Sequence, residues 1–319
     1  MLTKLLETIR PLDENAMESA RLHWDAIAKP LHSLGRLEDM IVQLAGICEN
    51  PVPAPRKKAV LIFCADNGIV AEGVTQTTQD VTAAVTQNFA KGIASVNALS
   101  RICGTEVFPV DIGVAQALDC PGVLNRKVAF GTQNFAHGPA MRRDEAEQAV
   151  CTGIDLVQEK AAEGYNLIVT GEMGIGNTTT SSAVFSVLQG LPPEQVTGRG
   201  AGLSDAGLQH KIQVISRAVA ALQPDPGDVL DVLSKVGGFD VCGMMGAFLG
   251  GAICRVPVLV DGFISAVAAN CAVRLCPACR DYIFASHCSK EPAGKMALDA
   301  LHLRAIWTVK CAWAKEQAA

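Results

Sequence analysis

The sequence predicts an α/β fold in which a mostly parallel sheet carries helices on both faces. Short apolar runs of the length of buried strands occur at 59–64, 106–110, 166–170 and 256–260, with a further strand expected at 281–285. Parallel strands are covered on both faces, which gives such continuous apolar runs. Helical stretches of crossover length separate the runs, and this alternation is typical of a parallel sheet with right-handed crossovers.

The two ends of the chain depart from this pattern. Apolar residues in the first fifty positions recur at helical intervals, the prolines from Pro51 to Pro55 mark a linker, and the tail from Lys290 reads as helical again. We therefore expect a small helical domain made of residues 1–55 and 290–319, and a large nucleotide-binding α/β domain made of residues 56–289.

Composition excludes several classes of protein. Hydrophobic residues make up 49% and charged residues 18% of the 319 positions, so a large core is expected rather than disorder. The net charge of -5 and the absence of a Lys/Arg block argue against nucleic acid as a partner. The N-terminus has no secretory signal, and Arg255, Pro257 and Asp261 interrupt the most apolar stretch. We expect a cytoplasmic protein without a membrane span.

The twelve cysteines are scattered through the chain and are expected to be reduced thiols packed as small hydrophobic groups. Cys276 and Cys279 have the spacing of a metal-ligand pair, with Cys271, His287 and Cys288 nearby in the sequence. A second pair with this spacing is missing, so structural zinc is only an alternative.

Four expected strands end in an acid beside a glycine, namely at Asp66, Asp111, Glu172 and Asp261. Ligands of open α/β sheets bind outside the carboxyl ends of the strands, so the pattern predicts a ring of carboxylates at a site. Asp and Gly also terminate strands well without any ligand, and Asp111 fits that structural role best.

The segment from Gly171 to Ala183 carries the sharpest signal for a ligand. A strand runs into a glycine-rich turn, then into Asn and Thr residues expected to cap a helix. Free backbone N–H groups and the helix dipole make such a helix start an anion site, most naturally for phosphate. It is not a Walker A loop, and Thr179 replaces the third glycine of a dinucleotide fingerprint. A tight turn without a ligand is the alternative interpretation.

Three further segments are candidates for ligand contacts. Gly198–Asp205 is a second glycine-rich loop followed by Lys211, which reads either as an ordinary surface lysine or as a mobile charge beside a phosphate. Lys235–Asp240 holds a glycine pair that fits a helix end or a site. Ser286 and His287 follow the last expected strand and read as ligand contacts or as satisfied loop residues, since the GxSxG elbow of a hydrolase is missing.

Together these segments resemble the nicotinate-nucleotide–dimethylbenzimidazole phosphoribosyltransferases, the CobT family. The matching stretches run in order from about residue 30 to residue 300 and are Leu34–Glu38, Ala65–Val74, Gly131–Ala136, Gly171–Thr179, Gly198–Asp205, Val236–Asp240, Asp261–Phe263 and Ser286–Pro292.

The resemblance implies a homodimer with a Rossmann-like large domain, and a reaction that needs no metal or cofactor. An aromatic nitrogen of the base attacks C1′ of nicotinate mononucleotide, nicotinate leaves, and α-ribazole 5′-phosphate forms with inversion. Glu172 would lie near the charge that develops at C1′. The residues expected to bind substrate are Gly174, Ile175, Gly176, Asn177, Thr178, Gly202, Lys211, Asp261, Ser286 and His287, with Thr77 and Thr78 in the region that holds the base.

The last residues depart from the family pattern. Family members carry a second carboxylate, the general base, in a C-terminal Gly-Glu-Gly-Thr-Gly motif. Here Lys315 stands at the glutamate position and Glu316 is one position away. We hypothesise that the tail after Ile306 is a frameshifted translation, which sequencing the gene would test. The alternative function is a nucleotide-binding member of the same scaffold with impaired catalysis.

Overall fold

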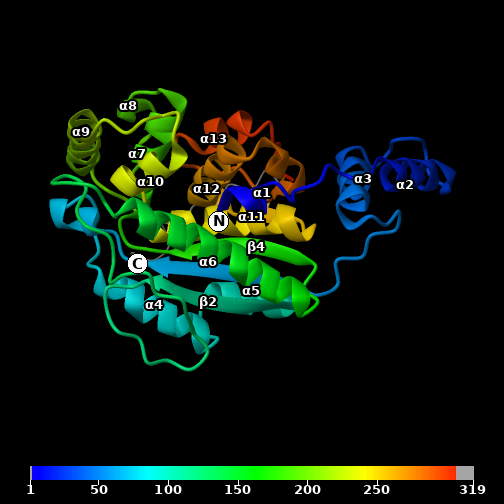
Figure 1. The fold of residues 1–319 in the computed structure, drawn as a ribbon, viewed down its shortest axis with the longest axis horizontal. Coiled ribbons are helices and arrows are strands. Elements are labelled where there is room, and N and C mark those ends of the chain that lie inside the picture. Colours follow the sequence, from blue (N-terminus) through cyan, green and yellow to red (C-terminus); the bar gives the residue numbers. More distant parts are fainter. Residues whose placement is uncertain (1, 307–319) are drawn as a thin grey trace.

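A computed structural model describes residues 2–306 and confirms the predicted fold class (Figure 1). Within these residues, six strands form one parallel sheet in the order β3-β2-β1-β4-β5-β6. The strands are β1 (Lys58–Ala65), β2 (Thr105–Gly113), β3 (Leu124–Asn125), β4 (Leu167–Met173), β5 (Val258–Val260) and β6 (Ile283–Ala285). Each of the five expected strands is present, while β3 is too short for its apolar pattern to be visible in the sequence.

Helices cover both faces of the sheet. Successive side chains of the central strand β1 point to opposite faces, and both sets are apolar, so each face needs a covering layer. Val60 and Ile62 pack toward α4 (Asp80–Ala90) and α5 (Ser95–Cys103). Phe63 packs toward the other face, where α11 lies. That second layer is thicker and contains α6 (Arg143–Ala162), α11 (Phe239–Cys254) and α12 (Gly262–Leu275).

Most of the other helices lie toward the two ends of the molecule, whereas α1 and α13 lie between them (Figure 1). Helices α7 to α10 gather at the end to which the strands point, and the first three helices lie at the opposite end or over α11. The remaining helices of the described chain have the following bounds: α1 (Leu2–Leu6), α2 (Glu14–Ala26), α3 (Arg36–Cys48), η1 (Gly68–Glu72), α7 (Asn177–Gln189), α8 (Pro193–Val196), α9 (Asp205–Leu222), α10 (Val229–Val236), η2 (Pro277–Tyr282) and α13 (Gly294–Ala300). None of the helices within residues 2–306 combines the length and apolar character of a membrane span.

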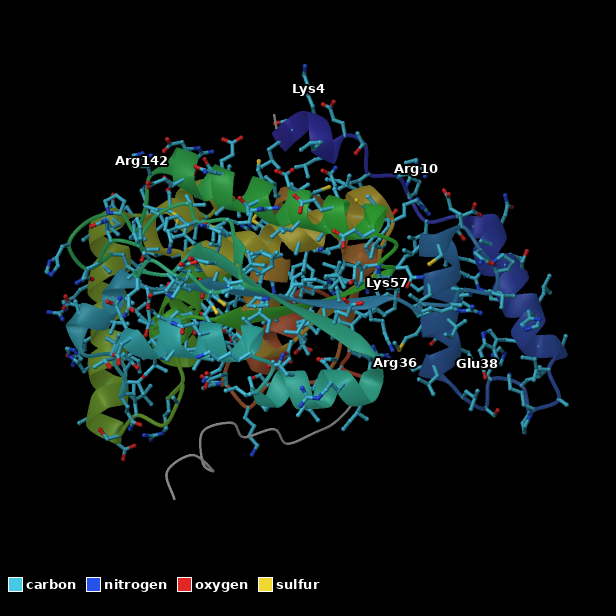
Figure 2. All side chains as sticks on the ribbon, turned by 90° about the horizontal axis from the view of Figure 1, so that it is seen from below. Lys4, Arg10, Arg36, Glu38, Lys57 and Arg142 are labelled. Atoms are coloured by element: carbon cyan, nitrogen blue, oxygen red, sulfur yellow. The ribbon has the colours of Figure 1, made fainter. Side chains whose placement is uncertain are left out.

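The pair α2–α3 projects from the main body, and Figure 2 shows Arg36 and Glu38 on it. The Arg255 guanidinium anchors the pair by donating to the carbonyls of Gly46 and Ile47, at 2.5 and 2.9 Å. Arg36 donates to the carbonyl of Ala305 at 2.6 Å, so α3 contacts the end of the described chain here.

Helix α13, by contrast, packs against α12, and its Ala297 and Leu298 belong to the main hydrophobic core. The small domain of residues 1–55 with 290–319 stays a prediction, because residues 307–319 lie outside the described part.

The thick layer depends on a backbone contact between α6 and α11 at two glycines. A Cβ on Gly246 would lie 2.0 Å from the carbonyl oxygen of Val150, and one on Gly153 would lie 2.0 Å from that of Gly243. Backbone atoms cannot yield as a side chain can, so only glycine permits this helix crossing.

Gly246→Ala is therefore expected to lower the free energy of unfolding by about 2–3 kcal/mol, because α6 and α11 must separate. Gly207→Ala in α9 is the control, since its new methyl group would meet side-chain atoms alone, with the flexible end of Leu203 at 3.1 Å and Ser204 Oγ at 3.4 Å. Helix propensity should make that variant neutral or more stable by up to about 1 kcal/mol. Urea unfolding measures both, and equal effects would contradict the proposed contact.

Candidate active site

A cleft of about 90 Å³ lies beside the carboxyl end of β4. Strands β1 and β4 are neighbours, but the chain continues from β1 to β2 on one side and from β4 to β5 on the other. Such a reversal of strand order opens a crevice at the strand ends, where ligands of this fold class bind. Three loops line the cleft, at 74–77, 174–178 and 199–203, and Lys211 from α9 completes it.

The turn after β4 is pressed against the end of β1, and this requires glycine. A Cβ on Gly174 would lie 2.4 Å from the carbonyl oxygen of Ala65. Gly176 has φ +92°, and its Cβ would lie 2.7 Å from Val70. Gly176 is the N-cap of α7, and no side chain caps this helix. The expected Asn/Thr cap is therefore wrong, since Asn177 is already the first helical residue and points elsewhere.

The uncapped helix start leaves donors available in the cleft. In the described chain, the backbone N–H groups of Gly176 and Thr178 find no acceptor, whereas the N–H of Ile175 donates to Thr82 Oγ1 at 3.2 Å. The first N–H groups of a helix carry the positive end of its dipole. This end of α7 can therefore hold an anion such as a phosphate.

Lys211 adds a full positive charge to the same place. It is only 1% exposed, and its Nζ donates to Thr178 Oγ1 at 2.8 Å and to the Gly198 carbonyl at 3.2 Å. Burial lowers the pKa of Lys211 to about 8, and the charge of Glu291 opposes that shift. The interpretation as an ordinary surface lysine is wrong, because α9 turns this side chain inward onto the second glycine-rich loop.

Glu172 lies on β4 beside this cradle and is the half-buried member of a polar cluster with Asn177 and Asp240. Its Oε2 accepts from Asn177 Nδ2 at 2.5 Å, and the same Nδ2 lies 3.1 Å from Asp240 Oδ2. Burial, and then the charge of Asp240, raise the pKa of Glu172 to about 7. Asp240 is fully buried, which raises its own pKa to about 6. Asn177 thus joins the cleft, which it lines, to the carboxylate beside it.

The candidates at the ends of β5 and β6 lie together, but outside the lining of the cleft. Ser286 Oγ donates to the carbonyl of Val260 at 2.7 Å, which satisfies this hydroxyl within the protein. His287 Nδ1 lies 3.6 Å from Asp261 Oδ1. The charge of Asp261 also acts on Glu172, so the three residues border the cluster of carboxylates.

Of the three candidates from the remaining loops, Thr77 and Gly202 lie at the cleft and Thr78 does not. Thr77 and Gly202 both line the cleft, and Gln76 Nε2 joins their loops by donating to the Gly202 carbonyl at 2.6 Å. Thr78 is not part of this lining, and its hydroxyl instead donates to Asp80 at the start of α4.

The acids at the ends of β1 and β2 hold the backbone that follows β2. Asp66 Oδ2 accepts from the Ala115 N–H at 2.8 Å, and Asp111 accepts from the Val114 N–H and from Lys127 Nζ, each at 3.0 Å. The structural interpretation of Asp111 therefore fits its contacts.

Two residues of the site, Asp240 and Asn67, were not predicted as site residues, although Asp240 lies in the Lys235–Asp240 motif. Asn67 Oδ1 accepts from Thr180 Oγ1 at 3.1 Å, which ties the end of β1 to α7. For Asp240, the available signal was an acid two positions after a glycine pair, inside an otherwise apolar stretch.

The cysteines behave as packed or solvent-facing thiols. All eleven that the structure describes are free, and the buried Cys279 thiol donates to the carbonyl of Phe248 at 3.2 Å. Across residues 2–306, no three His, Cys, Asp or Glu side chains gather closely enough to hold a metal ion. The spacing of Cys276 and Cys279 therefore gains no support as a zinc site in this part of the chain.

Comparison with known proteins decides the family. The model of a family described as phosphoribosyltransferase matches residues 9–312. The chain belongs to this phosphoribosyltransferase family. The nicotinate-nucleotide–dimethylbenzimidazole phosphoribosyltransferase of Acetivibrio thermocellus is 50% identical over 306 residues, covering 96% of this chain and 87% of that protein. The enzyme of the same name from Geobacter sulfurreducens is 46% identical over 300 residues, covering 94% of this chain and 85% of that protein.

A solved structure of this phosphoribosyltransferase family has the same fold. The crystal structure of CobT from Thermus thermophilus superposes with a TM-score of 0.89 at 39% identity, covering 93% of this chain and 90% of that one. The resemblance drawn from the ordered motifs is thus confirmed.

Gly176→Ala should destabilise the protein and weaken binding of a mononucleotide, because the methyl group meets both an unfavourable φ and Val70. Gly164→Ala is the matched control, with φ +89° but nothing within 4 Å of its Cβ. Backbone strain alone costs about 1–3 kcal/mol, so Gly176→Ala should exceed its control in urea unfolding. Equal unfolding energies, or unchanged binding of nicotinate mononucleotide by calorimetry, would contradict this account of the turn.

Proposed function

We propose that this chain transfers the phosphoribosyl group of nicotinate mononucleotide to 5,6-dimethylbenzimidazole, which releases nicotinate and forms α-ribazole 5′-phosphate for the nucleotide loop of cobalamin. Membership of the family supports the class of reaction. The single observation that supports the donor substrate is the anion cradle, in which the free N–H groups of α7 and the buried Lys211 share one cleft.

The cradle would fix the nucleotide by its 5′-phosphate. Gly176, Thr178 and Lys211 all line the same cleft. A phosphate there would return to Lys211 the charge stabilisation that burial removes. Held at this end, the ribose reaches toward Glu172, which is linked to the cradle through Asn177.

Glu172 would act electrostatically at C1′. When nicotinate leaves with the electrons of its bond to C1′, positive charge develops on the sugar, and a carboxylate placed beforehand stabilises it. The unprotonated ring nitrogen of the base forms the new bond to C1′ from the opposite face, and the base then loses the proton of its other ring nitrogen. A carboxylate that accepts this proton typically contributes about 10² to 10⁴ in rate.

The base would enter beside the loop of Thr77, which lines the cleft. Thr78 contributes through the start of α4 rather than by direct contact, since its hydroxyl is already bonded to Asp80. The carboxylate motif of the family tail, with Lys315 and Glu316 here, falls outside the described residues.

Nicotinate release in the presence of dimethylbenzimidazole tests the function. Glu172→Gln should lower kcat by about 10² to 10³, while Glu194→Gln on exposed α8 serves as the control.

Because the carboxylate form of Glu172 acts and its pKa is about 7, kcat should rise as pH increases through 7 and fall below it. Binding of the mononucleotide without nicotinate release would instead support the impaired alternative.

We also propose that the chain works as a homodimer in the cytoplasm. The projecting helices and the loop between them expose large apolar side chains, including Leu22 and Leu31 at 62% and 66%. Exposed apolar groups gathered on one projecting element are typical of a surface that another chain covers. The free cysteines of the described chain fit a reducing compartment.

Light scattering should give twice the 33.5 kDa mass of one chain. Introducing charge with Leu22→Glu and Leu31→Glu should shift the protein to monomers, whereas Leu99→Glu, at a position 61% exposed on α5, should leave the mass unchanged. A wild-type protein of single-chain mass would refute the dimer.

A further inference from the structure

We propose that Asp240 is a positioning residue for the reaction, because it holds the Asn177 amide that in turn holds the carboxylate of Glu172 beside the cleft. This inference rests on the proposed function and assigns a role to a residue that the reaction does not touch.

The geometry is that of one amide shared between two acids. Asn177 Nδ2 lies 2.5 Å from Glu172 Oε2 and 3.1 Å from Asp240 Oδ2. A primary amide nitrogen carries two N–H donors, so each acid takes one of them. With both donors engaged, the amide is fixed in rotation, and Glu172 meets its partner from a single direction.

Asp240 is an unfavourable residue for packing alone. It is fully buried in the first turn of α11, whose other buried residues are apolar or glycine. A buried carboxylate costs several kcal/mol unless charged or polar partners offset that cost. Its partners are the Asn177 amide and the Val241 N–H at 2.9 Å, and the N-terminal dipole of α11 favours its negative charge.

Two separate loops leave room for this carboxylate. A Cβ on Gly174 would lie 2.7 Å from Asp240 Oδ2, and a Cβ on Gly238 would lie 2.5 Å from Asp240 Oδ1. Gly174 belongs to the turn after β4 and Gly238 to the turn before α11. Asp240 therefore contacts the same turn that forms the anion cradle, and it links that turn to Glu172.

The charges around Glu172 make the link measurable. The charges of Asp240 on α11 and Asp261 after β5 both act on it, and Asp261 in turn faces His287. The charge of Asp240 raises the pKa of Glu172, whereas the Asn177 hydrogen bond lowers it. Removing the charge of Asp240 should therefore lower the pKa of Glu172, and removing the Asn177 amide should raise it.

The test is a titration of Glu172 in the full chain by ¹³C NMR with labelled glutamate carboxyls, with Glu172→Gln used to assign the signal. Asp240→Asn should move the midpoint to lower pH by about half a unit or more, and Asn177→Ala should move it to higher pH. Asp111→Asn is the control, because Asp111 is also buried near a strand end but pairs with Lys127.

The kinetic readout is the pH profile of nicotinate release. Asp240→Asn should shift the acid limb in the same direction as the titration, and should lower the plateau kcat by about tenfold with nearly unchanged KM for nicotinate mononucleotide. An unmoved midpoint in a folded Asp240→Asn protein would overturn the inference, as would shifts of the same sign in both variants. A midpoint that moves while no form of the protein releases nicotinate would refute the proposed function and leave the link between Asp240 and Glu172 in place.

Discussion

The close approach of the turn after β4 to the end of β1 is the constraint on which the site depends. Parallel register sets Cys64 beside Met173, so the two strands end at the same level. The chain then departs in opposite directions, and the space between the two departures becomes the cleft. Gly174 and Gly176 let α7 begin directly against β1. The free N–H groups, the Asn177 amide and the contact between Thr178 and Lys211 all follow from that starting point.

The site concentrates charges that a stable core would avoid. Burial favours the protonated form of Glu172, with a pKa of about 7, so the stability that this group contributes at acid pH is lost as pH rises from about 4.5 to about 7. Lys211 acts in the opposite sense. Its pKa is lowered to about 8, so the protein gains stability as pH rises from about 8 toward the ordinary value near 10.5. Around neutral pH both groups are unfavourable, and a bound phosphate with a developing cation on the sugar would offset them.

The local part of this arrangement could be predicted from the sequence, because it depends on neighbouring residues. A continuous apolar run is enough to predict β1 and β4, and the glycines after Glu172 are enough to predict a strand–turn–helix anion site. The capping prediction failed for a local reason as well. Asn177 could cap a helix, but the backbone of Gly176 at φ +92° already occupies that position, and the Asn177 amide turns to the two acids instead.

The rest depended on contacts between distant segments, which no local pattern encodes. A lysine in an amphipathic helix reads as solvent-facing, and Lys211 is buried only because the loop at Gly198 closes over it. Asp240 shows the same effect more strongly, since its partner Asn177 lies 63 positions away. Its burial still leaves a trace in the sequence, because the acid follows a glycine pair and stands in an apolar run. A buried acid that packing does not need requires partners, and here its side-chain partner Asn177 belongs to the helix start that we propose holds the phosphate.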